Sequence, residues 1–551
     1  MKIDIDSIGY RWKGIYSPFL SYIDGDVVYQ NGSVYVYRAG SLQNFALGQQ
    51  DALLAGYLLN GGVSVGGKFG QVLHSDGASG VGFRFEGERG GTIATALMET
   101  YNGAGSRANN RYMMTLMNEG MVRAWGRNIA GSLGIGRPDD IGLSQPRRVA
   151  FPVNAPRIIS IHSSWEATFF IGEDQSLWTC GSNTEFNNGT QAQRNIPIKL
   201  NGFGDLGANT KVQKVFSAFD YEGYRKVGCI DVNGQVYMWG TNRQGSCGWG
   251  NTTESQVPKV VPWTITNPCK DVWTTGGFYA ATMFVTLDGQ AYMAGEQTST
   301  GLGGGDRYIP TRFNPWDTSD PVKKYSQSES DDEDLLGNRY RDWGVLLENG
   351  ELYMWGSDDG KIGGGWGTGF TGNILPSSPN FPLLCLTNVQ DFFTKSGGNH
   401  GTVALMKDGT VRGTGSTNVS GTATNGTTWQ TIGGSYLTNV TKIRGLGGTN
   451  GGIMVALRSD GRCVIWGNKN AAGIRGIGND TASNGSNWEF VLLNKTIIDF
   501  QLSGETTGAL ADTSCHFLCS DGTVYTTGQG SYGQGGSREN FSRFTPNQII
   551  F

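Results

Sequence analysis

The sequence is poor in charge, in histidine and in long apolar runs. Only 16% of its 551 residues are Asp, Glu, Lys or Arg, and the formal net charge is −4. This balance argues against nucleic acid as the main partner, which requires a basic surface. No run of about 18 apolar residues exists, so no membrane-spanning helix is predicted. The first residues lack the apolar core of a signal peptide, and we expect folding in the cytoplasm.

The residue clusters of common metal and active sites are missing as well. The four histidines do not have metal-ligand spacing, and no phosphate-binding Gly-Lys-Ser/Thr loop occurs. The eight cysteines are widely spaced and form no C-x-x-C pair, which favours free, buried thiols. From these absences we predict no catalytic residue, no cofactor and no metal.

Glycine, by contrast, is abundant, with 87 residues, and much of it recurs in one hairpin pattern. A turn pair is followed by alternating residues and a terminal glycine, as in 233–240 and 349–356. The Asn-Gly or Asp-Gly turns tolerate the positive φ of a two-residue hairpin. Copies recur about every 57 residues. The eight terminal glycines are Gly126, Gly181, Gly240, Gly295, Gly356, Gly415, Gly467 and Gly528.

Each repeat contains enough apolar segments for four strands. A first strand such as 212–215 and a second such as 403–406 precede the hairpin turn and its third strand. After the terminal glycine come a glycine-rich loop and often a proline-containing strand, such as 257–260. Four strands per unit at this period predict an all-β fold, a β-propeller of four-stranded blades.

The residue before each terminal glycine predicts the number of blades. Large and small side chains alternate there, in the order Trp125, Cys180, Trp239, Ala294, Trp355, Thr414, Trp466 and Thr527. Close packing favours such alternation, and a closed ring can keep it only with an even number of units. We therefore predict eight blades over residues 93–551, with seven as the alternative. The blade-packing residues Trp125, Trp239, Trp355 and Trp466 should lie on alternate blades.

The repeat resembles that of the regulator of chromosome condensation (RCC1-like) β-propeller family. Its pattern, Asp/Asn-Gly-x-Val-Tyr-x-Trp-Gly-x-Asn-x-x-Gly-x-Leu-Gly, is clearest in 120–134 and 233–248, and the resemblance covers about 93–551. It implies a propeller, usually of seven blades, and functions that include small-GTPase exchange, chromatin binding and protein-inhibitor binding. The chromatin-binding members depend on a basic tail, which residues 547–551 do not supply.

The first ninety residues do not follow the repeat. Residues 1–40 predict a small aromatic β module with a turn at Asn31-Gly32, and residues 41–92 predict a linker with a short helix at 51–59. The module resembles those of bacteriophage tail and virion proteins, and 70–77 resembles a segment of phage fibre proteins. Five aromatic residues either form the module's core or contact a glycan or partner: Trp12, Tyr16, Tyr22, Tyr35 and Tyr37.

One acidic run stands out in the fifth repeat, and we expect it to form an inserted surface loop. It contains Glu329, Asp331, Asp332, Glu333 and Asp334. Such runs are usually solvated. The alternative is binding of a divalent cation or a basic partner, although the ligand spacing of a calcium loop is missing.

The functional prediction rests mainly on the residues outside the repeat. We predict a structural virion component of a bacteriophage, in the tail, neck or fibre, whose propeller displays loops for host-surface recognition or particle assembly. It would be located in the virion in multiple copies. Its partners would be other virion proteins and a host-surface glycan or protein, without nucleic acid or membrane insertion. The alternative is a propeller-type protein-binding scaffold. A glycan-degrading enzyme is less favoured because no pair of carboxylates is apparent, and we predict no enzyme activity.

Overall fold

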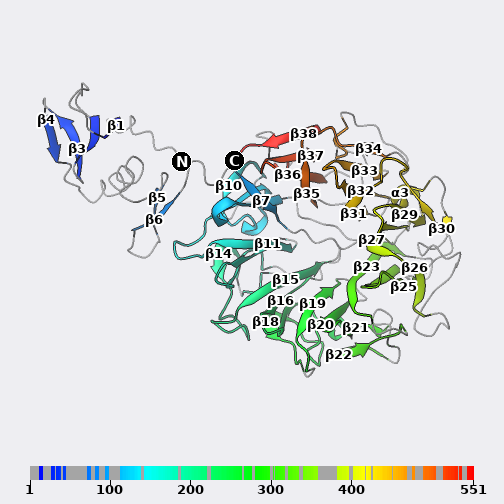
Figure 1. Cartoon of the computed structure of the whole chain (residues 1–551). Coiled ribbons are helices and arrows are strands. Elements are labelled where there is room, and N and C mark those ends of the chain that lie inside the picture. Colours follow the sequence, from blue (N-terminus) through cyan, green and yellow to red (C-terminus); the bar gives the residue numbers. More distant parts are fainter. Residues whose placement is uncertain are drawn as a thin grey trace. The chain divides into compact units, whose positions relative to one another are not determined.

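The computed structural model divides into two compact units, Met1–Ile93 with Pro152–Ala155, and Ala94–Phe151 with Pro156–Phe551 (Figure 1). In the residues that the structure describes, no helix is long and apolar enough to cross a membrane. The described residues are 11–15, 26–30, 33–38, 41–44, 71–75, 81–85, 93–98, 112–137, 142–164, 166–183, 188–190, 192–219, 225–263, 266–275, 280–297, 302, 305–316, 320–333, 339–357, 381–395, 401–415, 417–422, 426–448, 451–467, 474–477, 488–503, 513–530, 533–536 and 543–551.

The first unit contains a four-stranded sheet and a hairpin. The sheet has the order β1-β2-β3-β4, and β1 runs parallel to β2 while the other pairs are antiparallel. Gln30 lies opposite Ser33, on either side of the predicted Asn31-Gly32 turn. The helix expected at 51–59 lies outside the described residues. The strands are β1 (Arg11–Ile15), β2 (Asp26–Gln30), β3 (Ser33–Arg38), β4 (Ser41–Asn44), β5 (Gln71–Ser75) and β6 (Val81–Phe85).

The second unit contains eight antiparallel sheets, each made of four consecutive strands, which we call blades 1 to 8. Blade 1 is β7 (Ala94–Leu97), β8 (Tyr112–Met117), β9 (Val122–Arg127) and β10 (Gly142–Arg148). Blade 2 is β11 (Ile158–Ser164), β12 (Ala167–Gly172), β13 (Leu177–Gly181) and β14 (Arg194–Lys199). Blade 3 is β15 (Val212–Phe219), β16 (Arg225–Asp231), β17 (Val236–Gly240) and β18 (Ser255–Val260). Blade 4 is β19 (Cys269–Thr274), β20 (Ala281–Thr286), β21 (Ala291–Gly295) and β22 (Arg307–Phe313).

Blades 5 to 8 repeat this order. Blade 5 is β23 (Val322–Glu333), β24 (Arg339–Leu347), β25 (Leu352–Ser357) and β26 (Leu383–Leu386). Blade 6 is β27 (Val389–Lys395), β28 (Gly401–Met406), β29 (Val411–Gly415) and β30 (Gly426–Thr431). Blade 7 is β31 (Val440–Gly448), β32 (Gly451–Arg458), β33 (Cys463–Gly467) and β34 (Glu489–Phe490). Blade 8 is β35 (Ile497–Ser503), β36 (Ser514–Cys519), β37 (Val524–Gly528) and β38 (Arg543–Ile549). Short helical turns are α3 (Thr417–Ser420), η2 (Asn118–Gly120), η3 (Ile129–Gly131) and η5 (Arg243–Gly245).

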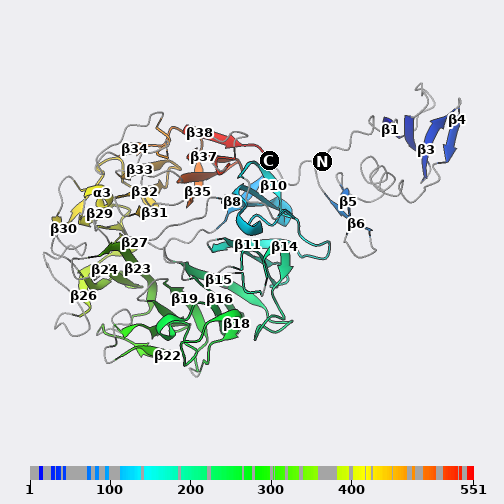
Figure 2. The same ribbon diagram turned by 180° about the vertical axis from the view of Figure 1, so that it is seen from behind.

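The blades stand side by side in a ring, which confirms the predicted eight-bladed propeller (Figures 1 and 2). The first strand of each blade lies toward the centre and the fourth strand lies at the periphery. First strands of most neighbouring blades contact one another, as β15 and β19 do, and β35 contacts β7 to close the ring. Blades 1 and 8 are each complete without a strand from the other, so closure depends on contacts between finished sheets.

One face of the ring carries the hairpin turns between the second and third strands, and we call it the turn face. The backbone N–H that opens a blade donates to a carbonyl in the turn of the preceding blade, as Val322 does to Gly289 at 3.1 Å. The same bond joins Ala94 to Gly522 at 2.9 Å across the closure. Gly289 has a φ of +81°, and a Cβ there would lie 2.0 Å from the Cβ of Pro321. Glycine at this position therefore adopts the turn conformation and leaves room for the first residues of the next blade.

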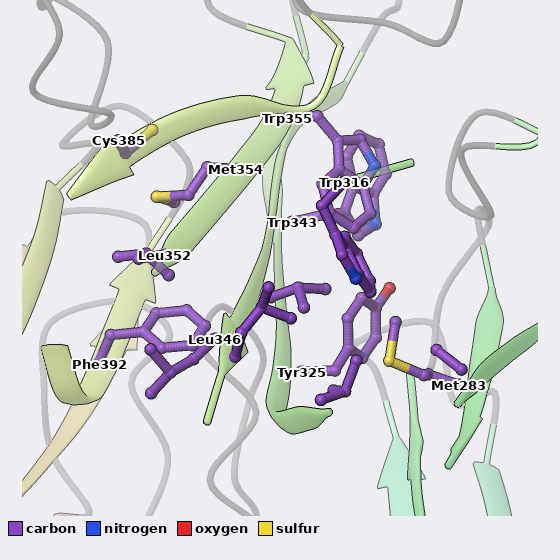
Figure 3. Close-up of a cluster of buried hydrophobic side chains, with 14 of the residues drawn as sticks. Met283, Trp316, Tyr325, Trp343, Leu346, Leu352, Met354, Trp355, Cys385 and Phe392 are labelled. Atoms are coloured by element: carbon purple, nitrogen blue, oxygen red, sulfur yellow. The ribbon is translucent and has the colours of Figure 1, made fainter. Parts of the chain in front are cut away.

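The hydrophobic core lies between successive blades. Figure 3 shows its part around blade 5, where Trp343 of β24 is opposite Trp355 of β25. Their ring centroids are 6.3 Å apart, and the two ring planes are nearly parallel, with an interplanar angle of 18°. Met283 of blade 4 and Phe392 of blade 6 belong to the same buried cluster. Each blade thus buries apolar side chains on both of its faces, and this burial stabilises the ring.

On blades 1, 2 and 8 the residue before the terminal glycine donates a hydrogen bond to the loop that follows the third strand of the preceding blade. Cys180 Sγ donates to Ser132 O at 3.4 Å, and Thr527 Oγ1 donates to Ile474 O at 2.7 Å. Trp125 Nε1 donates to Gln534 O at 3.0 Å, so the contact continues from blade 8 to blade 1.

Tryptophan fits this position because the loop opposite provides glycine. A Cβ on Gly189 would lie 3.1 Å from Trp239, one on Gly421 2.9 Å from Trp466, and one on Gly536 3.0 Å from Trp125. Trp239 also packs on Phe169 of β12, and Trp125 packs on His516 at the equivalent position of β36. Trp125, Trp239, Trp355 and Trp466 are fully buried on blades 1, 3, 5 and 7.

Candidate functional site

The aromatic residues predicted to contact a glycan or partner belong to the first unit. Trp12 lies on β1, and Tyr35 and Tyr37 lie on β3. Tyr16 and Tyr22 fall outside the described residues. The glycan-contact hypothesis therefore stays a prediction.

The acidic run is not an inserted loop over most of its length. Glu329, Asp331, Asp332 and Glu333 continue strand β23, while Asp334 lies outside the described residues. The register places Glu329 opposite Arg341 and Glu333 opposite Arg339 on β24, with an irregularity between the two pairs. The composition of the run alone does not reveal this strand register.

A regular charge pattern appears instead on the first strands of the blades. The third residue of this strand is Lys214 on blade 3, Lys324 on blade 5 and Lys442 on blade 7, whereas blades 4, 6 and 8 have an aspartate. Because the first strands lie toward the centre of the ring, these residues form an inner rim near the turn face. Each lysine pairs with the aspartate of the next blade, in the pairs Lys214–Asp271, Lys324–Asp391 and Lys442–Asp499.

In each of the three ion pairs the lysine Nζ donates to the Oδ1 of the aspartate on the next blade. Lys324 Nζ donates to Asp391 Oδ1 at 2.6 Å and to Phe392 O at 2.8 Å, and it lies 5.2 Å from the Phe392 ring centroid. Asp391 Oδ1 also accepts the backbone N–H of Phe392 at 2.8 Å, and Asp271 and Asp499 do the same with their following residues. Burial alone would raise the pKa of Asp391, but the charge and hydrogen bond of Lys324 hold this pKa below its usual value.

Blades 1 and 2 interrupt the pattern. The equivalent residues there are Ala96 and Ser160, so the fourth ion pair of the ring is replaced by two small uncharged side chains. Lys214, which follows the interruption, has 42% of its side chain exposed, compared with 26% for Lys324 and 25% for Lys442. The inner rim is therefore more open at the boundary of blades 2 and 3 than at the later lysines.

A cavity of about 380 Å³ lies at this opening. Its polar wall includes Ser160 of β11, Lys214 of β15 and the exposed Lys270 of β19. The full lining is Ser160, His162, Ile171, Gln213, Lys214, Val215, Lys270 and Leu287. The volume falls within the range of about 300–1,000 Å³ that is typical of ligand pockets.

The polar groups of the cavity are held in place by hydrogen bonds and one ion pair. His162 Nε2 lies 2.9 Å from Ser217 Oγ, which donates to Ser163 O at 3.2 Å, and these contacts hold the imidazole against blade 3. Lys214 and Lys270 contribute two ammonium groups, while Asp271 pairs with Lys214. The site can therefore attract an anionic group through charge and hydrogen bonds.

Exposed apolar side chains accompany the cavity on blades 2 to 4. Ile159, adjacent to Ser160, is 53% exposed, and Leu287 in the cavity wall is 64% exposed. Val232 occupies the turn position of blade 3 that matches Leu287 on blade 4, and it is 43% exposed. The same turn position is Glu348, Lys407 or Ser459 on blades 5 to 7. Large exposed apolar side chains beside a pocket are typical of interaction sites.

The thiols and the metal-binding residue types offer little chemistry in the described part of the chain. All eight cysteines are free and buried, which confirms the prediction of buried thiols. Burial raises the pKa of Cys247 and of Cys269 to about 12 in each case, so these thiols stay protonated and unreactive at neutral pH. Among the described residues, no group of three or more His, Cys, Asp and Glu side chains could hold a metal ion.

Sequence reasoning missed the inner rim, although its signal was present. The first strands align as Val212-Gln-Lys-Val215, Val389-Gln-Asp-Phe392 and Val440-Thr-Lys-Ile443. Their third position alternates in charge with the same two-blade period as the tryptophans. Composition could not show that this position faces the next blade.

Comparison with known proteins relates the propeller to RCC1-like repeats. Residues 233–279 match the Regulator of chromosome condensation (RCC1) repeat, a segment that runs from the turn of blade 3 into blade 4. The Ultraviolet-B receptor UVR8 of Arabidopsis thaliana is 26% identical over 245 residues, which cover 44% of this chain and 51% of the receptor. The E3 ubiquitin-protein ligase HERC2 of Homo sapiens is 24% identical over 266 residues, which cover 46% of this chain and 5% of the ligase.

Solved structures include two further similar chains. Human WBSCR16 has a TM-score of 0.48 and 18% identity, with 69% of this chain and 96% of that chain covered. Prp20p from Saccharomyces cerevisiae, described with its binding properties to Gsp1p and histones, has a TM-score of 0.46 and 17% identity, with 70% and 89% covered. The repeat match and the curated relatives support an RCC1-like β-propeller. The chain spans about half of UVR8 and a small part of HERC2, and these relatives do not support the virion prediction.

Proposed function

We propose that this protein is a propeller-type protein-binding scaffold whose partner docks on the turn face of blades 2 to 4. The observation that carries the proposal is a cavity with two lysines, with exposed Leu287 in its wall and exposed Ile159 next to its wall, together with Val232 exposed at the matching turn of blade 3. Protein interfaces combine an apolar centre with polar groups that orient the partner. The predicted alternative function is thus better supported than the virion component, and virion localisation stays a prediction.

The curated relatives include a receptor, UVR8, and a ubiquitin-protein ligase, HERC2, but the proposal is argued from this chain's own surface. The rigid ring holds the three apolar residues on separate blades, so little ordering is needed before a partner binds. Pre-organisation of this kind reduces the entropy lost on association.

The test uses the full chain, immobilised and incubated with lysate of its source cells, followed by reconstitution of the recovered partner from purified components. We expect one partner at a fixed stoichiometry. Leu287→Asp should abolish its binding, because a charge replaces the most exposed of the three apolar side chains. The matched control is Leu492→Asp, since Leu492 is 59% exposed on the linker that follows blade 7.

Two outcomes would contradict the proposal. One is failure to reconstitute any stoichiometric complex. The other is equal binding by the two variants, which would place the partner elsewhere on the molecule. Circular dichroism of both variants checks that the propeller has folded.

A further inference from the structure

We propose that the cavity at the boundary of blades 2 and 3 receives the carboxylate of an acidic side chain from a partner's extended segment. This inference rests on the proposed function and adds the chemistry of the partner. It depends on the interruption of the inner rim at Ala96 and Ser160, which leaves an opening beside Lys214.

The charge pattern of the rim shows which group is missing. Lys324 and Lys442 each stand between an aspartate on the preceding blade and an aspartate on the following blade. Lys214 has Asp271 on the following blade but Ser160 on the preceding one. A carboxylate in the cavity would supply negative charge on the side of Lys214 where the ring pattern places it for the other lysines.

The cavity wall provides matched contacts for such a group. The charges of Lys214 and Asp271 balance each other in their ion pair. Lys270 in the same wall therefore leaves the cavity with one net positive charge. Ser160 and Gln213 provide hydrogen-bond donors in the same wall. Charge-assisted hydrogen bonds to a carboxylate are stronger than neutral ones, and a partly enclosed site screens them less than open water does.

The apolar surroundings define the rest of the segment. Leu287 and Ile159 flank the polar wall and are both exposed, so residues next to the acidic one should be apolar. We infer a short acidic–apolar sequence, which inserts its carboxylate between blades 2 and 3 and lays its neighbours on the turn face.

The test measures binding of fluorescein-labelled hexaglutamate to the full chain by fluorescence anisotropy, with hexaglutamine as the neutral probe. We expect hexaglutamate to bind at least about tenfold more tightly at low salt and to weaken as salt is added. Lys270→Ala should weaken binding about fivefold. Ser160→Asp should weaken it about tenfold, because it places a carboxylate in the cavity wall.

Lys323→Ala is the matched control, since Lys323 occupies on blade 5 the strand position that Lys270 occupies on blade 4. Its binding should stay within about twofold of the unaltered protein. Equal losses for Lys270→Ala and Lys323→Ala would show diffuse attraction and overturn the site. Equal binding of the two probes would do the same.

Two further measurements separate this inference from related ones. Displacement of hexaglutamate by micromolar inorganic phosphate would identify a phosphate site and overturn the carboxylate assignment. If the purified partner binds Ser160→Asp and Lys270→Ala as tightly as the unaltered protein, the carboxylate inference fails while the protein-binding function stands. If no partner can be reconstituted but hexaglutamate binds as expected, the protein-binding function fails while the cavity's preference for a carboxylate stands.

Discussion

Blades 3 to 8 and blades 1 and 2 follow the same packing rule but differ in charge. In all eight blades the residue before the terminal glycine alternates between tryptophan and a small side chain. The Lys–Asp pairs of the inner rim lie at the boundaries of blades 3/4, 5/6 and 7/8, whereas Ala96 and Ser160 occupy the equivalent positions of blades 1 and 2.

The difference separates the tryptophan packing, which the ring requires for stability, from the ion pairs, which it can lose. A tryptophan buried between blades fills a volume that would otherwise be empty, and an empty volume costs stability wherever it lies. An ion pair that keeps a quarter or more of its side-chain surface in water contributes little. The tryptophan alternation is therefore kept in all eight blades, while the charge pattern can be interrupted with little loss of stability.

The largest expected effect is the loss of a blade-packing tryptophan. Trp125→Ala and Trp466→Ala should each lower the free energy of unfolding by about 3–5 kcal/mol, because both side chains are fully buried. Urea unfolding followed by circular dichroism measures the loss. If packing is equivalent in the two regions, the variants should agree, and a much smaller loss for Trp125 would show a looser first blade.

A smaller effect is expected from breaking one ion pair. Lys324→Met should lower the free energy of unfolding by about 2 kcal/mol at neutral pH, because it leaves the half-buried Asp391 carboxylate without its ammonium. The folded pKa of Asp391 lies below its unfolded value of about 3.9, so the ionised group stabilises the fold above that pH. The stabilisation is lost as pH falls through the folded pKa.

The pH dependence checks the cause of that loss. The difference in unfolding free energy between the unaltered protein and Lys324→Met should shrink as the pH is lowered from 6 toward 2. A difference that stays constant over this range would mean that the methionine acts through packing rather than charge.

The smallest effect on stability is expected from completing the charge pattern. The double variant Ala96→Lys/Ser160→Asp builds the missing pair and should change the free energy of unfolding by only about 0.5 kcal/mol, as partly exposed pairs do. Thermal unfolding measures this change. A gain above about 2 kcal/mol would show that the charge pattern, like the packing, is a requirement of the ring.

Much of the propeller was predictable because its signals are local and repeated. The Asn-Gly and Asp-Gly turns, the terminal glycines and the tryptophan alternation predicted eight four-stranded blades correctly. The acidic run was assigned to a loop because composition does not contain the strand register that places Glu329 opposite Arg341. The inner rim was missed for a similar reason, since Lys214 and Asp271 are separated along the chain and meet only when blades 3 and 4 stand side by side.

The amino-acid pattern alone is sufficient for the class of fold, the number of blades and the positions of the packing residues, because each depends on hairpins whose residues are close together in the chain. The binding surface depends on residues of three different blades, Ser160, Lys214 and Lys270, and on how closely those blades approach. Only the closed ring brings them to one cavity. The tertiary structure therefore decided where the proposed docking surface lies, since that surface is a product of packing between repeats rather than of any repeat by itself.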